Sequence, residues 1–162
     1  MKKTTLVFLF STLFLASCKK ETQYIYGVED VSVNRREGNK QNTKSTTEFI
    51  SIAYSDIFGT TIPNDGLVKL QLAYSAFGDQ KLIEQLIIRN LLNQGGNTTI
   101  PTSTEMRADI GLFINKSYVK FYGRNPNEFE LYYLKSMIET DLSITPELVY
   151  FGMMTSNEYR YY

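Results

Sequence analysis

The chain has 162 residues, with 17 lysines and arginines against 17 aspartates and glutamates, one cysteine, no histidine and no tryptophan. This length suits one domain, and the balanced charge lacks the basic stripe that neutralises nucleic-acid phosphates. Without histidine there is no imidazole ligand or Ser-His-Asp triad, and a single cysteine cannot form a thiolate cluster or an internal disulfide. The composition therefore predicts no nucleic acid, no metal and no cofactor.

Residues 1–17 have the pattern of a secretory signal peptide. Lys2 and Lys3 form a positive start, and the apolar run that follows is much shorter than the roughly 20 residues that span a bilayer. The run ends in Leu15-Ala16-Ser17-Cys18, which resembles the lipobox of bacterial lipoproteins. This resemblance implies cleavage before Cys18, acylation of its thiol and a membrane anchor. The alternative is a plain signal peptide with an incidental cysteine near the cleavage site.

The mature chain is predicted to begin with an anchored tether, residues 18–44. Lys19, and not aspartate, follows the cysteine, and by resemblance to lipoprotein sorting in enterobacteria this favours the outer membrane; the leaflet stays open. Few large apolar residues are present to offset the cost of ordering the tether. Within it, the apolar residues 24–33 either form a short strand or lie on the folded part.

Residues 45–162 predict an all-α fold, a small bundle of about six helices. In the first unit, residues 45–95, Ser45 begins a capping box with Glu48, Gly59 ends the first helix, and Asp79 caps the third. In the second unit, residues 102–162, further start signals open three helices. These signals are the capping box Thr102-Ser103-Thr104-Glu105, then Asn125-Pro126-Asn127-Glu128, and finally Thr145-Pro146.

The two units share a pattern that indicates an internal duplication. Phe49, Tyr54 and Gly59 each recur 64 residues later, as Phe113, Tyr118 and Gly123. A Pro-Asn pair then recurs after 63 residues, at 63–64 and 126–127. Two such units are expected to pack on each other as one closed bundle.

The motif residues of the second unit resemble the phycobilisome-linker-like helical domain of bacterial surface proteins. They are Phe113, Tyr118, Gly123-Arg124, Pro126 and the closing Ser156-Asn157-Glu158-Tyr159. The resemblance covers about the last 50 residues, and the first unit lacks the closing motif. It implies a helical, non-catalytic interaction module and names no ligand.

Arg124 follows the glycine that ends a predicted helix, where its cation opposes the helix dipole. We hypothesise that it ties this turn to a carboxylate such as Glu158. The alternative is a solvated arginine that contributes little.

No arrangement of catalytic side chains stands out, so we expect no enzyme. Glu128 and Glu130 are two residues apart on a helix and point in different directions. Ser117 and Lys120 lie one turn apart but lack the motif of a Ser-Lys hydrolase.

Twelve tyrosines and ten phenylalanines make the chain rich in aromatic side chains. Tyrosine suits sugar faces and protein contacts, so Tyr133 and Tyr159 are candidate ligand contacts. The alternative is that most tyrosines lie in the core, and that the tail from Tyr159 covers the end of the bundle. The expected function is that of a non-catalytic, membrane-anchored lipoprotein, a scaffold or accessory subunit with a protein partner in the cell envelope. The alternative is a glycan- or peptide-binding module that uses exposed tyrosines.

Overall fold

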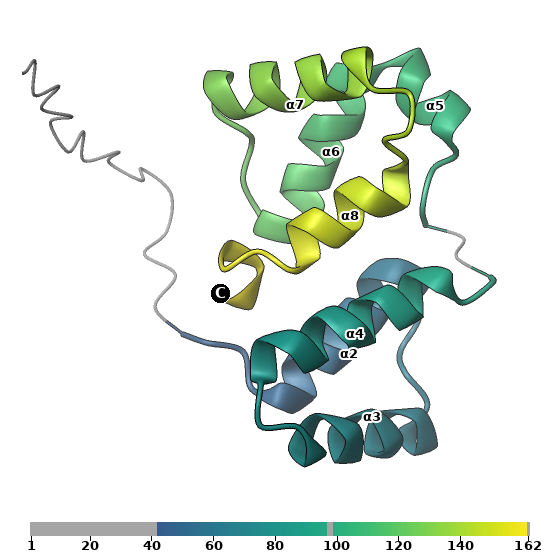
Figure 1. The fold of residues 1–162 in the computed structure, drawn as a ribbon, viewed down its shortest axis with the longest axis vertical. Helices are drawn as coiled ribbons and strands as arrows, with labels where there is room; N and C mark the ends of the chain where they lie inside the picture. Colours follow the sequence, from purple (N-terminus) through teal and green to yellow (C-terminus); the bar gives the residue numbers. More distant parts are fainter. Residues whose placement is uncertain (1–41, 97–98, 162) are drawn as a thin grey trace, which may run out of the picture. The chain divides into compact units, whose positions relative to one another are not determined.

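The computed structural model describes residues 42–96 and 99–161, so the predicted signal peptide, Cys18 and the tether up to residue 41 lie outside the described residues. The described residues form helices and no strand, which confirms the all-α class (Figure 1). The helices are α2 (Thr46–Phe58), α3 (Asn64–Ala76), α4 (Gln80–Asn93), α5 (Ser103–Ala108), α6 (Ile110–Tyr122), α7 (Glu128–Thr140) and α8 (Pro146–Met154), followed by a 3-10 turn, η2 (Glu158–Arg160). In this part of the chain, no helix has both the length and the apolar character to cross a membrane.

Local capping determines where the helices begin and end. The Ser45 hydroxyl accepts from the amide of Glu48 at 3.3 Å, and the Glu48 carboxylate accepts from the amide of Ser45 at 2.8 Å. Gly59 and Gly123 end α2 and α6 with φ of 70° and 66°, the left-handed conformation that glycine adopts without steric cost. These predicted ends are confirmed.

Two helix boundaries differ from the predicted ones. The predicted continuous helix from residue 102 to Gly123 is interrupted at Asp109. The Asp109 side chain accepts from the amide of Leu112 and so starts α6. The described residues therefore hold seven α-helices instead of six. Helix α7 is capped by Asn127 and not by Asn125, because Asn127 forms a reciprocal capping box with Glu130. The first change is an additional cap inside the expected helix, and the second is a capping side chain two residues after the predicted one.

The folded part also begins earlier than Ser45. Lys44 is 6% exposed, and its amide donates to the carbonyl of Arg160 at 3.0 Å. Its ammonium group donates to the Tyr159 carbonyl, and Thr43 forms an isolated antiparallel bridge with Tyr161. The last residues assigned to the tether are therefore packed against the C-terminal segment.

The two units share one hydrophobic core but differ in how their helices close. In the first unit α2, α3 and α4 all contact one another. In the second unit α6 contacts both α7 and α8, and α8 contacts α4 of the first unit. A cavity separates α7 from α8, where the first unit has direct contact between α3 and α4.

Candidate binding cleft between α7 and α8

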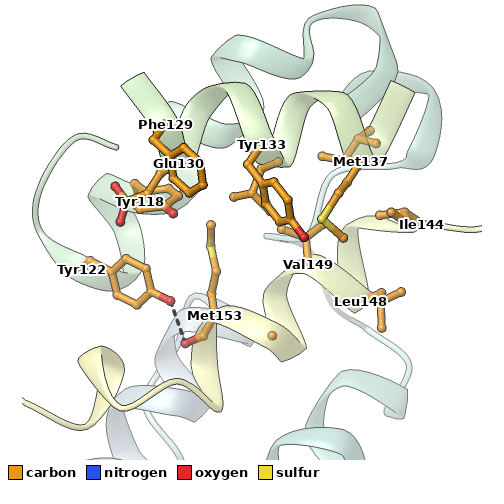
Figure 2. Close-up of a pocket in the computed structure, with 13 residues that line it drawn as sticks. Tyr118, Tyr122, Phe129, Glu130, Tyr133, Met137, Ile144, Leu148, Val149 and Met153 are labelled. Carbon is orange, nitrogen blue, oxygen red and sulfur yellow. Dashed lines mark hydrogen bonds between the residues drawn. The ribbon is translucent and has the colours of Figure 1, made fainter. Parts of the chain in front are cut away.

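An apolar cavity of about 390 Å³ lies between α6, α7 and α8 in the second unit (Figure 2). We call it the α7–α8 cleft. Aromatic, aliphatic and methionine side chains line it, among them Tyr118, Phe129, Tyr133, Met137, Leu148 and Met153. Its volume lies within the range of roughly 300–1,000 Å³ that is typical of ligand pockets.

The cleft has a buried floor and exposed rims. Tyr118 and Met153 on the floor are 6% and 5% exposed, whereas Phe129 and Tyr133 on the α7 rim are 73% and 55% exposed. Phe129, Tyr133 and Met137 are spaced four residues apart, so they form a row along one side of α7. The rings of Phe129 and Tyr133 are nearly parallel, with centroids 5.9 Å apart.

Gly152 lies in α8 on the opposite wall. A Cβ atom added at this position would meet no atom within 4 Å, so no neighbouring group of the described chain requires a glycine there. Glycine inside a helix is less favourable than alanine by about 1 kcal/mol. Its effect is to leave open space along the α8 wall, where another backbone can approach closely.

Two polar side chains of the cleft, Tyr118 and Glu130, lie at one end. Figure 2 shows Tyr118 and Glu130 at the end near the start of α7, and Met137, Ile144 and Leu148 at the other. The Tyr118 hydroxyl forms no hydrogen bond with the described residues; burial, together with the nearby Glu130 carboxylate, raises its pKa. The Tyr133 hydroxyl lies apart from this end, near Val149, so hydrogen-bonding groups of the cleft are present at more than one place (Figure 2).

Tyr122 supports the floor from α6. Its hydroxyl donates to the carbonyl of Met153 at 3.1 Å, and it lies 3.0 Å from the Ser156 hydroxyl (Figure 2). Burial is the main cause that raises the pKa of Tyr122. This hydrogen bond joins α6 to the end of α8 and keeps the floor closed.

Arg124 joins the start of α7 to η2. Its guanidinium pairs with Glu158, with Nε 2.6 Å from Oε1, and with Glu130, with Nη2 2.8 Å from Oε1. The structure thus contains the hypothesised pair, and adds Glu130 as a second carboxylate. Hydrogen bonds to Glu130 and Glu158 raise the pKa of Arg124 further above its ordinary value. These contacts position the α7 end of the cleft.

Of the two alternatives for Tyr159, to cover the end of the bundle or to present a ligand, the structure shows the first. It is 1% exposed, and its hydroxyl donates to Oδ2 of Asp56 in α2 at 2.7 Å. The aromatic ring fills the core beside Phe49 and Phe121. Tyr159 therefore covers the end of the bundle and does not face solvent.

The other predicted contact, Tyr133, is exposed and lines the cleft. Sequence reasoning missed Phe129, Tyr118 and Gly152 as members of the same site. The four-residue spacing of Phe129, Tyr133 and Met137 was the signal that could have revealed the α7 rim. Tyr118 and Gly152 carried no such signal, because their place depends on how α6 and α8 cross α7.

Three of the residues considered for catalysis are held in structural contacts, Glu130 by Arg124 as described above. The Ser117 hydroxyl donates to the carbonyl of Phe113 at 2.8 Å, and the Lys120 ammonium donates to the Thr99 hydroxyl at 3.3 Å. Over residues 42–96 and 99–161, no group of three or more Asp, Glu, Cys or His side chains is placed to hold a metal ion.

Comparisons with protein-family models, with curated proteins and with solved structures found no match for this chain. The resemblance of residues 113–159 to the phycobilisome-linker-like domain stays a prediction. In the structure, Arg124 of the turn pairs with Glu158 of the closing motif, and within that motif the Ser156 hydroxyl accepts from the amide of Tyr159.

Proposed function

We propose that this protein is a non-catalytic lipoprotein, anchored through Cys18, whose helical domain binds a protein partner of the cell envelope in the α7–α8 cleft. It would act as a scaffold or accessory subunit of an envelope complex. The observation that carries this proposal is the cleft itself, an apolar cavity bordered by exposed Phe129, Tyr133 and Leu148. Contiguous exposed apolar surface of this kind marks interaction sites on soluble domains.

The composition of the cleft favours a protein as its partner. Tyrosine, phenylalanine and methionine are enriched in the cores of protein interfaces, and lysine and glutamate are depleted there. The residues that contribute most to binding cluster in desolvated pockets near the centre of an interface. The buried floor around Tyr118 and Met153 offers such a pocket.

The anchor rests on the lipobox Leu15-Ala16-Ser17-Cys18. Its test is an intact-mass measurement on the chain purified from membranes of its native host. We expect a chain that begins at Cys18 and carries the added mass of two or three acyl groups. A mature chain with an unmodified Cys18 would contradict the anchor.

Photo-cross-linking in native membranes tests the cleft as the contact site. A photoreactive phenylalanine analogue in place of Tyr133 is expected to capture an envelope protein that mass spectrometry identifies. The matched control places the same analogue at Val68, which is 52% exposed on α3. Equal capture from both positions, or none from position 133, would argue against the cleft.

A glycan is the second candidate ligand. The near-parallel rings of Phe129 and Tyr133, at an interplanar angle of 14°, offer a flat apolar surface of the kind that suits a sugar face. A glycan array distinguishes the two: this candidate predicts sugar binding that is lost with Phe129→Ala and kept with Tyr132→Ala. Tyr132 serves as the control because it is 74% exposed and does not line the cleft.

A further inference from the structure

We propose that the segment bound in the α7–α8 cleft is an amphipathic α-helix of the partner, with basic residues beside its apolar face. This inference rests on the proposed function and names the chemistry of the partner. Three features of the described residues support it: the shape of the cleft, the glycine on its α8 wall, and the charges along its borders.

The shape of the cleft suits a helix. Helix α7 has 13 residues and is therefore about 20 Å long at roughly 1.5 Å per residue. Phe129, Tyr133 and Met137 are spaced four residues apart and form one ridge along α7. Such a ridge fits into a groove on the surface of a facing helix. Helices bound in apolar grooves present anchors with the matching spacing of three or four residues.

Gly152 permits close approach on the opposite wall. Its position has no atom of the described chain within 4 Å of an added Cβ, and it lies one turn after Leu148 on α8. A small residue on a helix surface lets the backbone of a second helix come near. The two methionines of the cleft, Met137 and Met153, are flexible and polarizable, so they adapt to the side chains of such a helix.

The charges around the cleft favour a basic partner. Residues 128–148, which form α7 and the start of α8, contain five acidic residues and one lysine. That lysine, Lys135, already pairs with Glu139 at 3.9 Å, and Arg124 neutralises Glu130. Asp141 lies near the cation of Arg107, which donates to the carbonyls of Asp141 and Ile144. Glu128 and Glu147 remain as exposed negative charges next to the lining residues Phe129 and Leu148. Complementary charge on the partner steers association and excludes acidic competitors.

The experiment uses a synthetic helix as its probe. A peptide of about 18 residues carries leucine along one helical face, lysine elsewhere and a single tryptophan on the apolar face. Because the protein has no tryptophan, the peptide's fluorescence reports binding without interference. The protein is the mature lipoprotein purified from membranes and reconstituted in nanodiscs of uncharged phosphatidylcholine, and empty nanodiscs give the background signal.

We expect saturable binding with a blue shift of the tryptophan emission. Gly152→Leu should weaken it about tenfold or more by filling the cleft, and Leu148→Lys, at a 53% exposed position, should do so by repelling the peptide. Gly66→Leu makes the same change in α3, away from the cleft, and should leave binding unchanged. A peptide with its leucines scrambled, and one with glutamate in place of lysine, should each bind about tenfold more weakly.

Several results would overturn the proposal. One is equal binding of the ordered and scrambled peptides; another is undiminished binding by both cleft variants. Binding of palmitate that Gly152→Leu abolishes, without binding of the lysine peptide, would make the cleft a lipid site instead. A cross-link from position 133 without peptide binding would overturn the helix but keep the proposed function. Peptide binding without any cross-link would show that the cleft accepts a helix but would contradict the proposed contact with an envelope protein.

Discussion

Arg124 and Glu158 stand 34 residues apart in the chain and form a two-point ion pair, with Nε 2.6 Å from Oε1 and Nη2 2.8 Å from Oε2. The same guanidinium makes two further hydrogen bonds of 2.8 Å to Glu130 in the first turn of α7. It also lies 5.2 Å from the ring centroid of Tyr118, on the floor of the cleft. One side chain thus connects the turn before α7, the C-terminal segment and the cleft.

Arg124→Ala is expected to destabilise the fold. The Arg124 side chain is 20% exposed, and the substitution leaves two partly buried carboxylates without their cation. We expect the free energy of unfolding to fall by about 2 kcal/mol, measured by urea denaturation with circular dichroism. Arg124→Lys should not restore it, because an ammonium group cannot make both two-point pairs.

The matched control is Lys135→Ala. It removes an ion pair of 3.9 Å whose side chains are both 51% exposed. Such an exposed pair contributes about 0.3–0.5 kcal/mol on a helix. If the two substitutions changed stability equally, Arg124 would have no special structural role.

Tyr159→Phe tests the buried hydrogen bond between the C-terminal segment and α2. The substitution keeps the ring among Phe49 and Phe121 but removes the donor to Asp56 Oδ2 at 2.7 Å. The carboxylate then loses a partner, so we expect a loss of about 1–2 kcal/mol in thermal or urea unfolding. The same change at the 74% exposed Tyr132 should have almost no effect; a loss of similar size there would contradict this account.

Asp56 should give the fold a measurable pH dependence. Burial raises its pKa, although the hydrogen bond from Tyr159 and the charges of Lys120 and Lys44 act in the opposite direction. Because the pKa is higher in the folded than in the unfolded state, the native protein holds the proton longer. Its contribution to stability is therefore present at low pH and is lost as pH rises from about 3.9 through the folded pKa.

Asp56→Asn removes this titration and keeps an oxygen that can accept from Tyr159. The stability of the variant relative to the natural chain should therefore increase between about pH 4 and 7. Urea denaturation of both proteins at several pH values measures this difference, and other titrating groups cancel in it. A difference that decreases with pH would mean that Lys120 and Lys44 outweigh burial.

Gly152→Ala is expected to stabilise the protein. Nothing in the described chain lies within 4 Å of the added methyl group, so the gain in helix propensity of about 1 kcal/mol is not offset by a clash. Gly123→Ala provides the contrast, since φ of 66° at that position strains an alanine by roughly 1–2 kcal/mol. Opposite shifts of the melting temperature check this pair. A loss of stability in Gly152→Ala would show that the glycine is needed by the fold itself.

Much of the helical framework was predictable because its signals are local. Ser45 with Glu48, Thr102 with Glu105, and the left-handed glycines 59 and 123 act within one turn of the backbone. The errors were also local: Asp109 added a second helix start after Thr102, and Asn127 offered an alternative cap two residues after Asn125. The free energies that two competing caps contribute differ by less than the free energy of tertiary packing. Tertiary packing therefore decides which cap is used, and the sequence alone does not.

The candidate site was predictable only in part. Tyr133 was a candidate contact because tyrosine suits sugar faces and protein contacts, and it does line the cleft. Tyr159, the other candidate tyrosine, is buried because the C-terminal segment packs against Asp56 of α2 and Phe121 of α6. Which tyrosine faces solvent depends on that packing, which no pattern within the last residues encodes.

The sequence by itself determined the helical class, most helix ends and the turn motif around Arg124, since these depend on backbone capping and on hydrophobic spacing over a few residues. The tertiary structure alone decided that Arg124 meets two carboxylates, that Lys44 is buried, and that α7 stands apart from α8. Those relationships join segments far apart in the chain, and their geometry follows from how whole helices pack. The cleft is such a relationship: its residues come from three helices, and only the crossing of those helices makes them one surface.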